Sequence, residues 1–123
     1  ATARWLPSVA PHTGEPLPFN PGWAIRAMCA YDAYLLKQVR NTAGPRDRWA
    51  FTLCAYNGGL GWVHRDRALA ASTGREPARY WGSVEHVNAG RKPAAFRENR
   101  EYPRRIFSIQ SVYEQAGWGP AVP

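Results

Sequence analysis

The sequence has few of the residues that bind metals or cross-link chains: two cysteines and three histidines among 123 residues. Cys29 and Cys54 stand in no Cys-x-x-Cys or Cys/His spacing, and the histidines are scattered, so we expect no metal site and no other cofactor. Both cysteines fall within helical apolar patterns, which predicts buried thiols. A disulfide between them across two packed helices remains an alternative.

Long apolar runs are also missing, because charged residues interrupt each one well before the roughly 20 residues that a membrane-spanning helix needs. We therefore expect no membrane span. Strand-like alternation, internal repeats and low-complexity runs are absent too. There is no initiator Met, and Ala1 to Leu6 reads like the end of a helix. We therefore expect residues 1–123 to form a single but partial domain.

Acidic residues are scarce, with nine Asp and Glu against sixteen Lys and Arg, for a formal net charge of +7. Such a chain favours polyanions, namely nucleic acid, an anionic membrane surface or a bacterial cell wall. A basic surface that is only solvated explains the charge equally well. Since no helix-turn-helix or other reading motif is present, we do not expect nucleic acid as a partner.

Apolar residues instead recur at helical spacing, which predicts an all-α fold. Asn20 offers an N-cap before Pro21 at the first helical position. A Pro- and Gly-rich surface loop is expected over 7–20, and a tail over 117–123. We expect helices over 21–40, 46–56, 61–71 and 94–116, the last interrupted at Pro103, and a short helix over 76–87.

The first long helix carries an apolar stripe with a carboxylate on it. The stripe consists of Ile25, Met28, Cys29, Leu35, Leu36 and Val39. Asp32 falls on the same face, where a carboxylate needs a partner or a water-filled site. We favour a buried structural hydrogen bond over a catalytic role.

The most informative segment places Tyr56 and Asn57 at the end of a helix, directly before Gly58 and Gly59. This arrangement exposes a phenol and a carboxamide, and the glycines let a ligand approach the backbone. An amide both donates and accepts, which suits an N-acetyl or hydroxyl group of a sugar. A simple helix C-cap is the alternative.

This segment resembles the Ala-Tyr-Asn-x-Gly motif of the soluble lytic transglycosylase domain, in the goose-type lysozyme-like superfamily. Three further stretches match that family in the right order. Ala1-Thr2-Ala3 resembles the end of its Gly-Leu-x-Gln motif region, residues 20–35 resemble its Asn-Ile-x-Ala-Gly helix, and residues 98–106 resemble its closing Glu-Thr-Arg-x-Tyr motif. Asp32 and Pro103 depart from the usual apolar residues. The Gly-Gly-Leu-Gly-Trp variant looks most like bacteriophage members.

The resemblance implies a lysozyme-like helical fold, of which this chain is the C-terminal portion. It also implies cleavage of peptidoglycan strands between N-acetylmuramic acid and N-acetylglucosamine. In that scheme one glutamate first protonates the glycosidic oxygen. It then takes a proton from the muramyl C6 hydroxyl, which attacks the anomeric carbon and leaves a 1,6-anhydromuramyl end. Such an enzyme acts in the periplasm, outside the cell or on a virion.

The family's catalytic glutamate precedes a serine, and no glutamate of this sequence does. We therefore expect a missing N-terminal segment of the same domain to carry it. The resemblance assigns substrate contacts to Tyr56, Asn57, Gly58 and Gly59. It gives Tyr102 a supporting catalytic role against the glutamate, with a core position as the alternative. Structural ion pairs are expected for Glu98 and Arg100. A non-catalytic glycan-binding module and a lysozyme-type muramidase are the other readings of the function.

Overall fold

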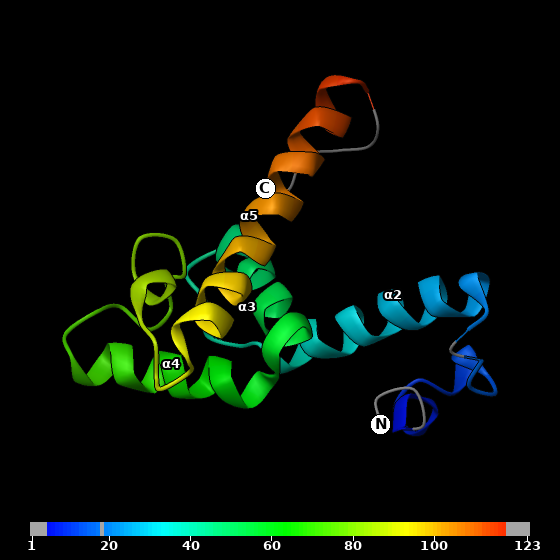
Figure 1. Cartoon of the computed structure of the whole chain (residues 1–123), viewed down its shortest axis with the longest axis horizontal. Helices are drawn as coiled ribbons and strands as arrows, with labels where there is room; N and C mark the ends of the chain where they lie inside the picture. The colour runs from blue at the N-terminus through cyan, green and yellow to red at the C-terminus, as the bar shows by residue number, and fades with distance from the viewer. Residues whose placement is uncertain (1–4, 18, 118–123) are drawn as a thin grey trace. The chain divides into compact units, whose positions relative to one another are not determined.

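The computed structural model describes residues 5–17 and 19–117, and every regular element in this part is helical (Figure 1). The predicted all-α class is therefore confirmed. The chain divides into two compact units, Ala1–Gln38 and Val39–Pro123, which are described separately. The motif at Ala1-Thr2-Ala3 and all of the 117–123 tail except Gly117 lie outside the described residues.

The first unit contains two short 3-10 helices, η1 (Leu6–Ser8) and η2 (Pro11–Thr13), followed by α2 (Pro21–Gln38). The Oδ1 atom of Asn20 accepts a hydrogen bond of 2.9 Å from the amide of Trp23. This bond satisfies one of the amides that a helix start leaves unpaired, so Asn20 caps α2 as predicted.

The core of the first unit consists of Leu6, Ala10, Trp23, Ala27 and Ala30. The predicted 7–20 loop is thus only partly a surface loop. The three α2 members recur four and three residues apart, and the small alanines let the preceding segment approach the helix closely. The indole Nε1 of Trp23 donates to the carbonyl of Thr13 at 3.1 Å, which fastens that segment to α2.

The apolar stripe predicted for α2 is wrong over its first half. Ile25 and Met28 are 60% and 41% exposed, and Cys29 is exposed as well. The buried face is turned toward Ala27 and Ala30 instead. Asp32 also differs from expectation, because its Oδ1 is buried without a hydrogen-bond partner in the described chain. Burial raises the pKa of this carboxyl to about 6.

The second unit is built around α3 (Pro45–Gly58), which contacts both α4 (Leu60–Ser72) and α5 (Pro93–Gln115). Residues 50–55 of α3 are all buried. A run of six consecutive buried residues means that this part of the helix is covered on all sides. The short 3-10 helix η3 (Val84–His86) packs against α4.

The short helix predicted over 76–87 is wrong, because this segment forms turns that end in η3. Gly82 adopts a φ of 76°, in the left-handed region that a helix does not use. Asp47 of α3 stabilises the turns, since its Oδ1 accepts from the amides of Tyr80 and Trp81 at 2.9 and 3.3 Å.

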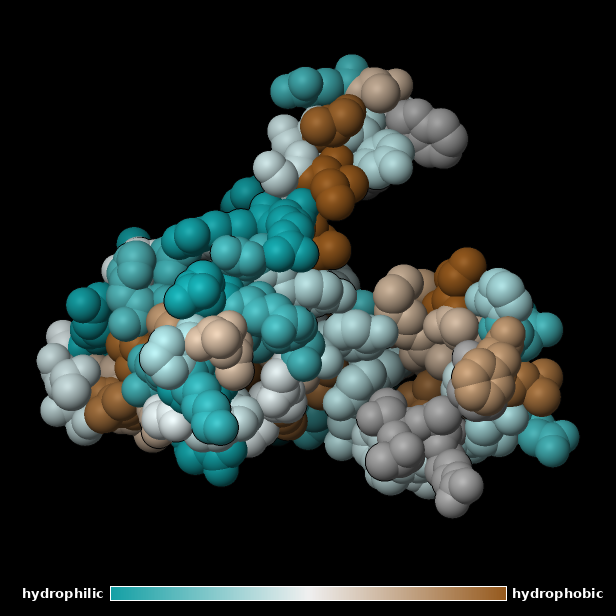
Figure 2. Space-filling view, viewed as in Figure 1, coloured by the Kyte–Doolittle hydropathy of each residue, from teal (hydrophilic) through white to brown (hydrophobic). Residues whose placement is uncertain are grey.

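Helix α5 runs without a break through Pro103, contrary to the predicted interruption. Pro103 has no N–H to donate to the carbonyl of Asn99, four residues earlier. The thiol of Cys54 lies 3.8 Å from that carbonyl oxygen and offers a replacement donor. The outer half of α5 carries the exposed side chains of Ile106, Ile109 and Val112 (Figure 2). Among the described residues, no helix has the length and apolarity that crossing a bilayer requires.

Candidate functional site

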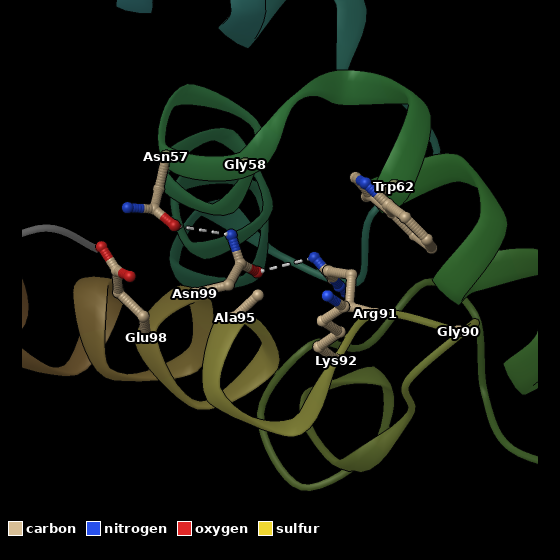
Figure 3. A pocket seen from close by; sticks show the side chains of 9 residues that line it. All are labelled: Asn57, Gly58, Trp62, Gly90, Arg91, Lys92, Ala95, Glu98 and Asn99. Atoms are coloured by element: carbon tan, nitrogen blue, oxygen red, sulfur yellow. Dashed lines mark hydrogen bonds between the residues drawn. The ribbon is translucent and has the colours of Figure 1, made fainter.

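A pocket of about 440 Å³ opens in the second unit, where the end of α3, the first turn of α4 and the first turns of α5 meet (Figure 3). The loop before α5 completes its wall. The lining residues are Asn57, Gly58, Trp62, Gly90, Arg91, Lys92, Ala95, Glu98 and Asn99.

Glycine is required where α3 ends at this pocket. A Cβ atom on Gly58 would lie 2.8 Å from the Nδ2 atom of Asn99, closer than non-bonded atoms tolerate. The next residue, Gly59, has a φ of 100°, which the other residue types rarely adopt. The group that approaches the backbone closely at Gly58 is Asn99 of the chain itself, whereas the sequence predicted the approach of a ligand.

Asn99 connects α5 to the end of α3 and sets the orientation of Asn57. It is 1% exposed, and its Nδ2 donates to the carbonyl of Cys54 and to Oδ1 of Asn57, both at 3.0 Å. Because the Asn57 oxygen is engaged, its amide nitrogen is turned away from Asn99 (Figure 3). Asn57 therefore presents a donor in a fixed orientation.

Beneath the pocket lies a buried charge cluster centred on Asp66, which is 1% exposed. Its Oδ2 accepts from the guanidinium groups of Arg91 and Arg100, the latter at 2.8 Å. Its Oδ1 accepts from the amide of Ala89 at 2.9 Å. Three charge-assisted hydrogen bonds thus tie α4 to α5 and to the loop before it.

Arg100 also organises the segment around η3. Its Nε donates to the carbonyl of Glu85 at 2.9 Å, and its Nη2 donates to that of Val87 at 2.8 Å. The ion pair expected for Arg100 is therefore confirmed, with Asp66 as its partner. The ion pair expected for Glu98 is wrong, because this carboxylate is exposed and pairs with no cation in the described residues.

Glu85 has a different environment. Burial tends to raise the pKa of this carboxyl, but the Gly82 amide and the guanidinium of Arg104 act in the opposite direction and together lower it. The Glu85–Arg104 pair spans 3.0 Å and holds η3 against α5.

Arg91 links the charge cluster to the pocket. Its side chain is 6% exposed, its Nη2 bonds to Asp66, and its Nη1 donates to Oδ1 of Asn99 at 3.2 Å. Its Nε is buried and has no hydrogen-bond partner in the described chain. The guanidinium carbon lies 5.1 Å from the centre of the Trp62 ring, so an indole forms the wall beside the cation.

The two predicted tyrosines meet next to the pocket but do not line it. The rings of Tyr56 and Tyr102 are stacked, with centroids 6.1 Å apart and planes inclined by 11°. Both side chains are half-buried. The structure thus brings Tyr56 and Tyr102 together as one pair, and places Asn57 and Gly58 in the pocket wall one step further along α3.

Sequence reasoning missed Trp62, Arg91, Asn99 and Asp66. A sequence signal existed for Asp66. Val63, three residues earlier, and Ala70, four residues later, lie on the same face of the helix, and both are buried. No pattern in the sequence pointed to Arg91, which lies in a loop among many other arginines.

The cysteines are both free thiols, so the disulfide alternative is wrong. Cys54 is buried as predicted, and burial raises the pKa of its thiol. Cys29 is exposed, against the prediction. Within residues 5–17 and 19–117, no group of three or more His, Cys, Asp or Glu side chains could hold a metal ion.

The pocket therefore combines an oriented amide, an indole wall, the buried cation of Arg91 and the exposed cation of Lys92 with one exposed carboxylate, Glu98. These groups can bind and orient a polar ligand. Comparison of the chain with models of protein families, with curated proteins and with solved structures finds no match.

Proposed function

We propose that this chain is part of a peptidoglycan lytic transglycosylase domain of lysozyme-like fold and supplies the glycan-binding side of its cleft. One observation carries the proposal. Two motif segments that resemble the family come together, although Asn57 and Asn99 are 42 residues apart in sequence. Their side chains are hydrogen-bonded, and the tyrosines within the same two motifs, Tyr56 and Tyr102, are stacked. Residues that share one substrate need this kind of convergence.

In this proposal the residues of the chain bind and position, and the acid–base glutamate comes from outside the 123 residues. Asn57 donates from a fixed amide, which suits an N-acetyl carbonyl or a hydroxyl oxygen of the sugar. Tyr102 supports the reacting centre through its contact with Tyr56. Glu98 is unsuited to be the general acid, because such a group needs partial burial to keep its proton, and Glu98 is exposed. The enzyme acts on the cell wall, which it reaches from the periplasm, from outside the cell or from a virion.

The products of digestion test the reaction. Purified sacculi are incubated with residues 1–123 and, separately, with the longest natural form of the protein, and the soluble fragments are analysed by mass spectrometry. We expect the longer form to release 1,6-anhydromuramyl ends, and residues 1–123 to bind sacculi without releasing any. Muramic acid with a free reducing end would instead indicate a lysozyme-type muramidase.

A matched pair of variants tests the site. Asn57→Ala removes the oriented donor, and we expect it to weaken retention on sacculi by about tenfold, the effect of one lost hydrogen bond to a ligand. Gln115→Ala removes an exposed amide near the far end of α5 and should leave retention unchanged. Equal retention of both variants would remove Asn57 from the binding site.

A second candidate, a non-catalytic glycan-binding module, is favoured by the exposure of Glu98, the only carboxylate among the pocket-lining residues. The same digestion separates the two candidates. Firm retention of the longest natural form on sacculi, with no soluble fragments of either kind, supports the module.

A further inference from the structure

The buried cluster beneath the pocket carries unbalanced charge. Arg91 and Arg100 share one carboxylate, that of Asp66, and all three side chains are at most 7% exposed. The remaining buried carboxylate nearby, Glu85, is already paired with Arg104. One positive charge is therefore left without a counter-ion in a setting where burial of an uncompensated charge is costly.

The unsatisfied donor is found at the same place. Arg91 uses both terminal nitrogens on Asp66 and Asn99, whereas its Nε is buried and makes no hydrogen bond in the described chain. Arg91 is also a lining residue of the pocket. A buried donor of this kind calls for an acceptor, and the pocket beside Arg91 is large enough to admit one.

The start of α5 adds further donors. Its N-cap residue is Lys92, which forms no side-chain cap, and Pro93 at the first helical position has no N–H. The amides of Ala94 and Ala95 are therefore left without acceptors within the helix, at its electropositive end. Lys92 and Ala95 line the pocket, so the ammonium group and this helix start lie beside Arg91 (Figure 3).

From this convergence we propose that the pocket at the start of α5 binds a carboxylate of the ligand through Arg91, Lys92 and the amides of Ala94 and Ala95. A compact monoanion fits better than a polyanion. Glu98 lies on the side of Asn99 opposite to Arg91, and its carboxylate repels a second negative charge on the ligand (Figure 3). The identification of that carboxylate rests on the proposed function. A muramyl residue that carries no stem peptide, such as N-acetylmuramic acid itself, has a free lactyl carboxylate, and N-acetylglucosamine has none.

Nuclear magnetic resonance tests the site directly, because the Arg91 Nε–H and the amides of Ala94 and Ala95 each give a separate signal. The intact 123-residue chain is titrated at constant ionic strength with sodium acetate, sodium phosphate, N-acetylmuramic acid and N-acetylglucosamine. We expect the three signals to shift together with acetate, to shift at lower concentration with N-acetylmuramic acid, and to stay in place with N-acetylglucosamine.

Each other result has a defined meaning. If acetate shifts the signals and N-acetylmuramic acid is no better, the anion site stands and its muramyl assignment fails, whereas retention of the Asn57 variant on sacculi decides the proposed function separately. Much tighter binding of phosphate than of acetate overturns the assignment to a carboxylate. If no anion moves the three signals, the site itself is overturned, whatever the sacculi digestion shows.

The two lysines of the chain provide matched variants. Lys92→Gln should raise the dissociation constant for N-acetylmuramic acid about threefold to tenfold, because it removes a direct charge-assisted donor. Lys37→Gln removes the same charge from α2 and should leave that constant unchanged. Equal effects of the two variants would mean that only overall charge attracts the ligand, and would overturn the proposed contact.

Discussion

Replacing Asp66 with Asn tests whether the buried charge cluster stabilises the second unit. The substitution keeps the size of the side chain but removes the charge that two guanidinium groups share. The amide of the new Asn side chain also places its N–H groups against one or both guanidinium groups. Removing one partner of a buried ion pair costs about 3–5 kcal/mol, because the remaining charge stays buried without compensation. A domain of this size is stabilised by only about 5–15 kcal/mol.

Urea unfolding followed by circular dichroism measures this loss. With a slope of about 2 kcal/mol per molar urea, a loss of about 4 kcal/mol lowers the unfolding midpoint by about 2 M. Glu101→Gln is the control, since it removes the carboxylate of an exposed pair in which Arg105 and Glu101 are 66% and 46% exposed and 2.9 Å apart. We expect that control to change stability by less than about 0.5 kcal/mol.

A double variant separates charge from packing. Adding Arg91→Gln to Asp66→Asn reduces the number of unpaired buried cations from two to one, so the double variant should be more stable than Asp66→Asn alone. If the double variant is less stable, or if Asp66→Asn behaves like Glu101→Gln, the electrostatic explanation of the cluster is refuted.

Two further predictions concern Asp32 and Gly58. The pKa of Asp32 in the folded chain, about 6, exceeds its ordinary value of 3.8, so its protonated form stabilises the fold fully below about pH 3.8, and this stabilisation is lost as the pH rises through 6. Asp32→Asn should therefore be more stable than the parent by about 1 kcal/mol at pH 7, a value reduced for partial exposure. Near pH 3 the two should be equally stable. If thermal melts show the same difference in stability at both pH values, this explanation is contradicted. Gly58→Ala should cost about 1–3 kcal/mol in urea unfolding, because its Cβ displaces the buried Asn99. Gly61→Ala, whose Cβ would meet only the side chain of Arg65 at 3.6 Å, should be neutral or stabilising, and an equal loss in both variants would exclude the proposed clash.

The helices were largely predictable from sequence because their ends carry local signals. Asn20 and Pro21 mark the start of α2, and Gly58 with Gly59 mark the end of α3, as the structure has them. The turns over 76–87 were not predictable, since they depend on Asp47, about thirty residues earlier. Local propensity contains no information about such a distant acceptor.

The candidate site was predictable only in part, for a similar reason. Asn57 and Gly58 stood out because a polar pair before glycines is visible along the chain. The partner that orients Asn57 is Asn99, on another helix, and the sequence shows nothing unusual at that position. The face of α2 was misjudged because alanines, which score as weakly apolar, form its buried side, while the larger Ile25 and Met28 remain outside.

The unequal exposure of Cys29 and Cys54 has a practical consequence. A maleimide dye or spin label added to the native chain will attach to the thiol of Cys29 on α2 and leave the buried thiol of Cys54 on α3 untouched, since only an accessible thiolate reacts. The natural sequence thus provides a single attachment point on the first unit. Energy transfer from a dye at that point to a second dye on α5 would report the separation of the two units in solution without altering the interior of either.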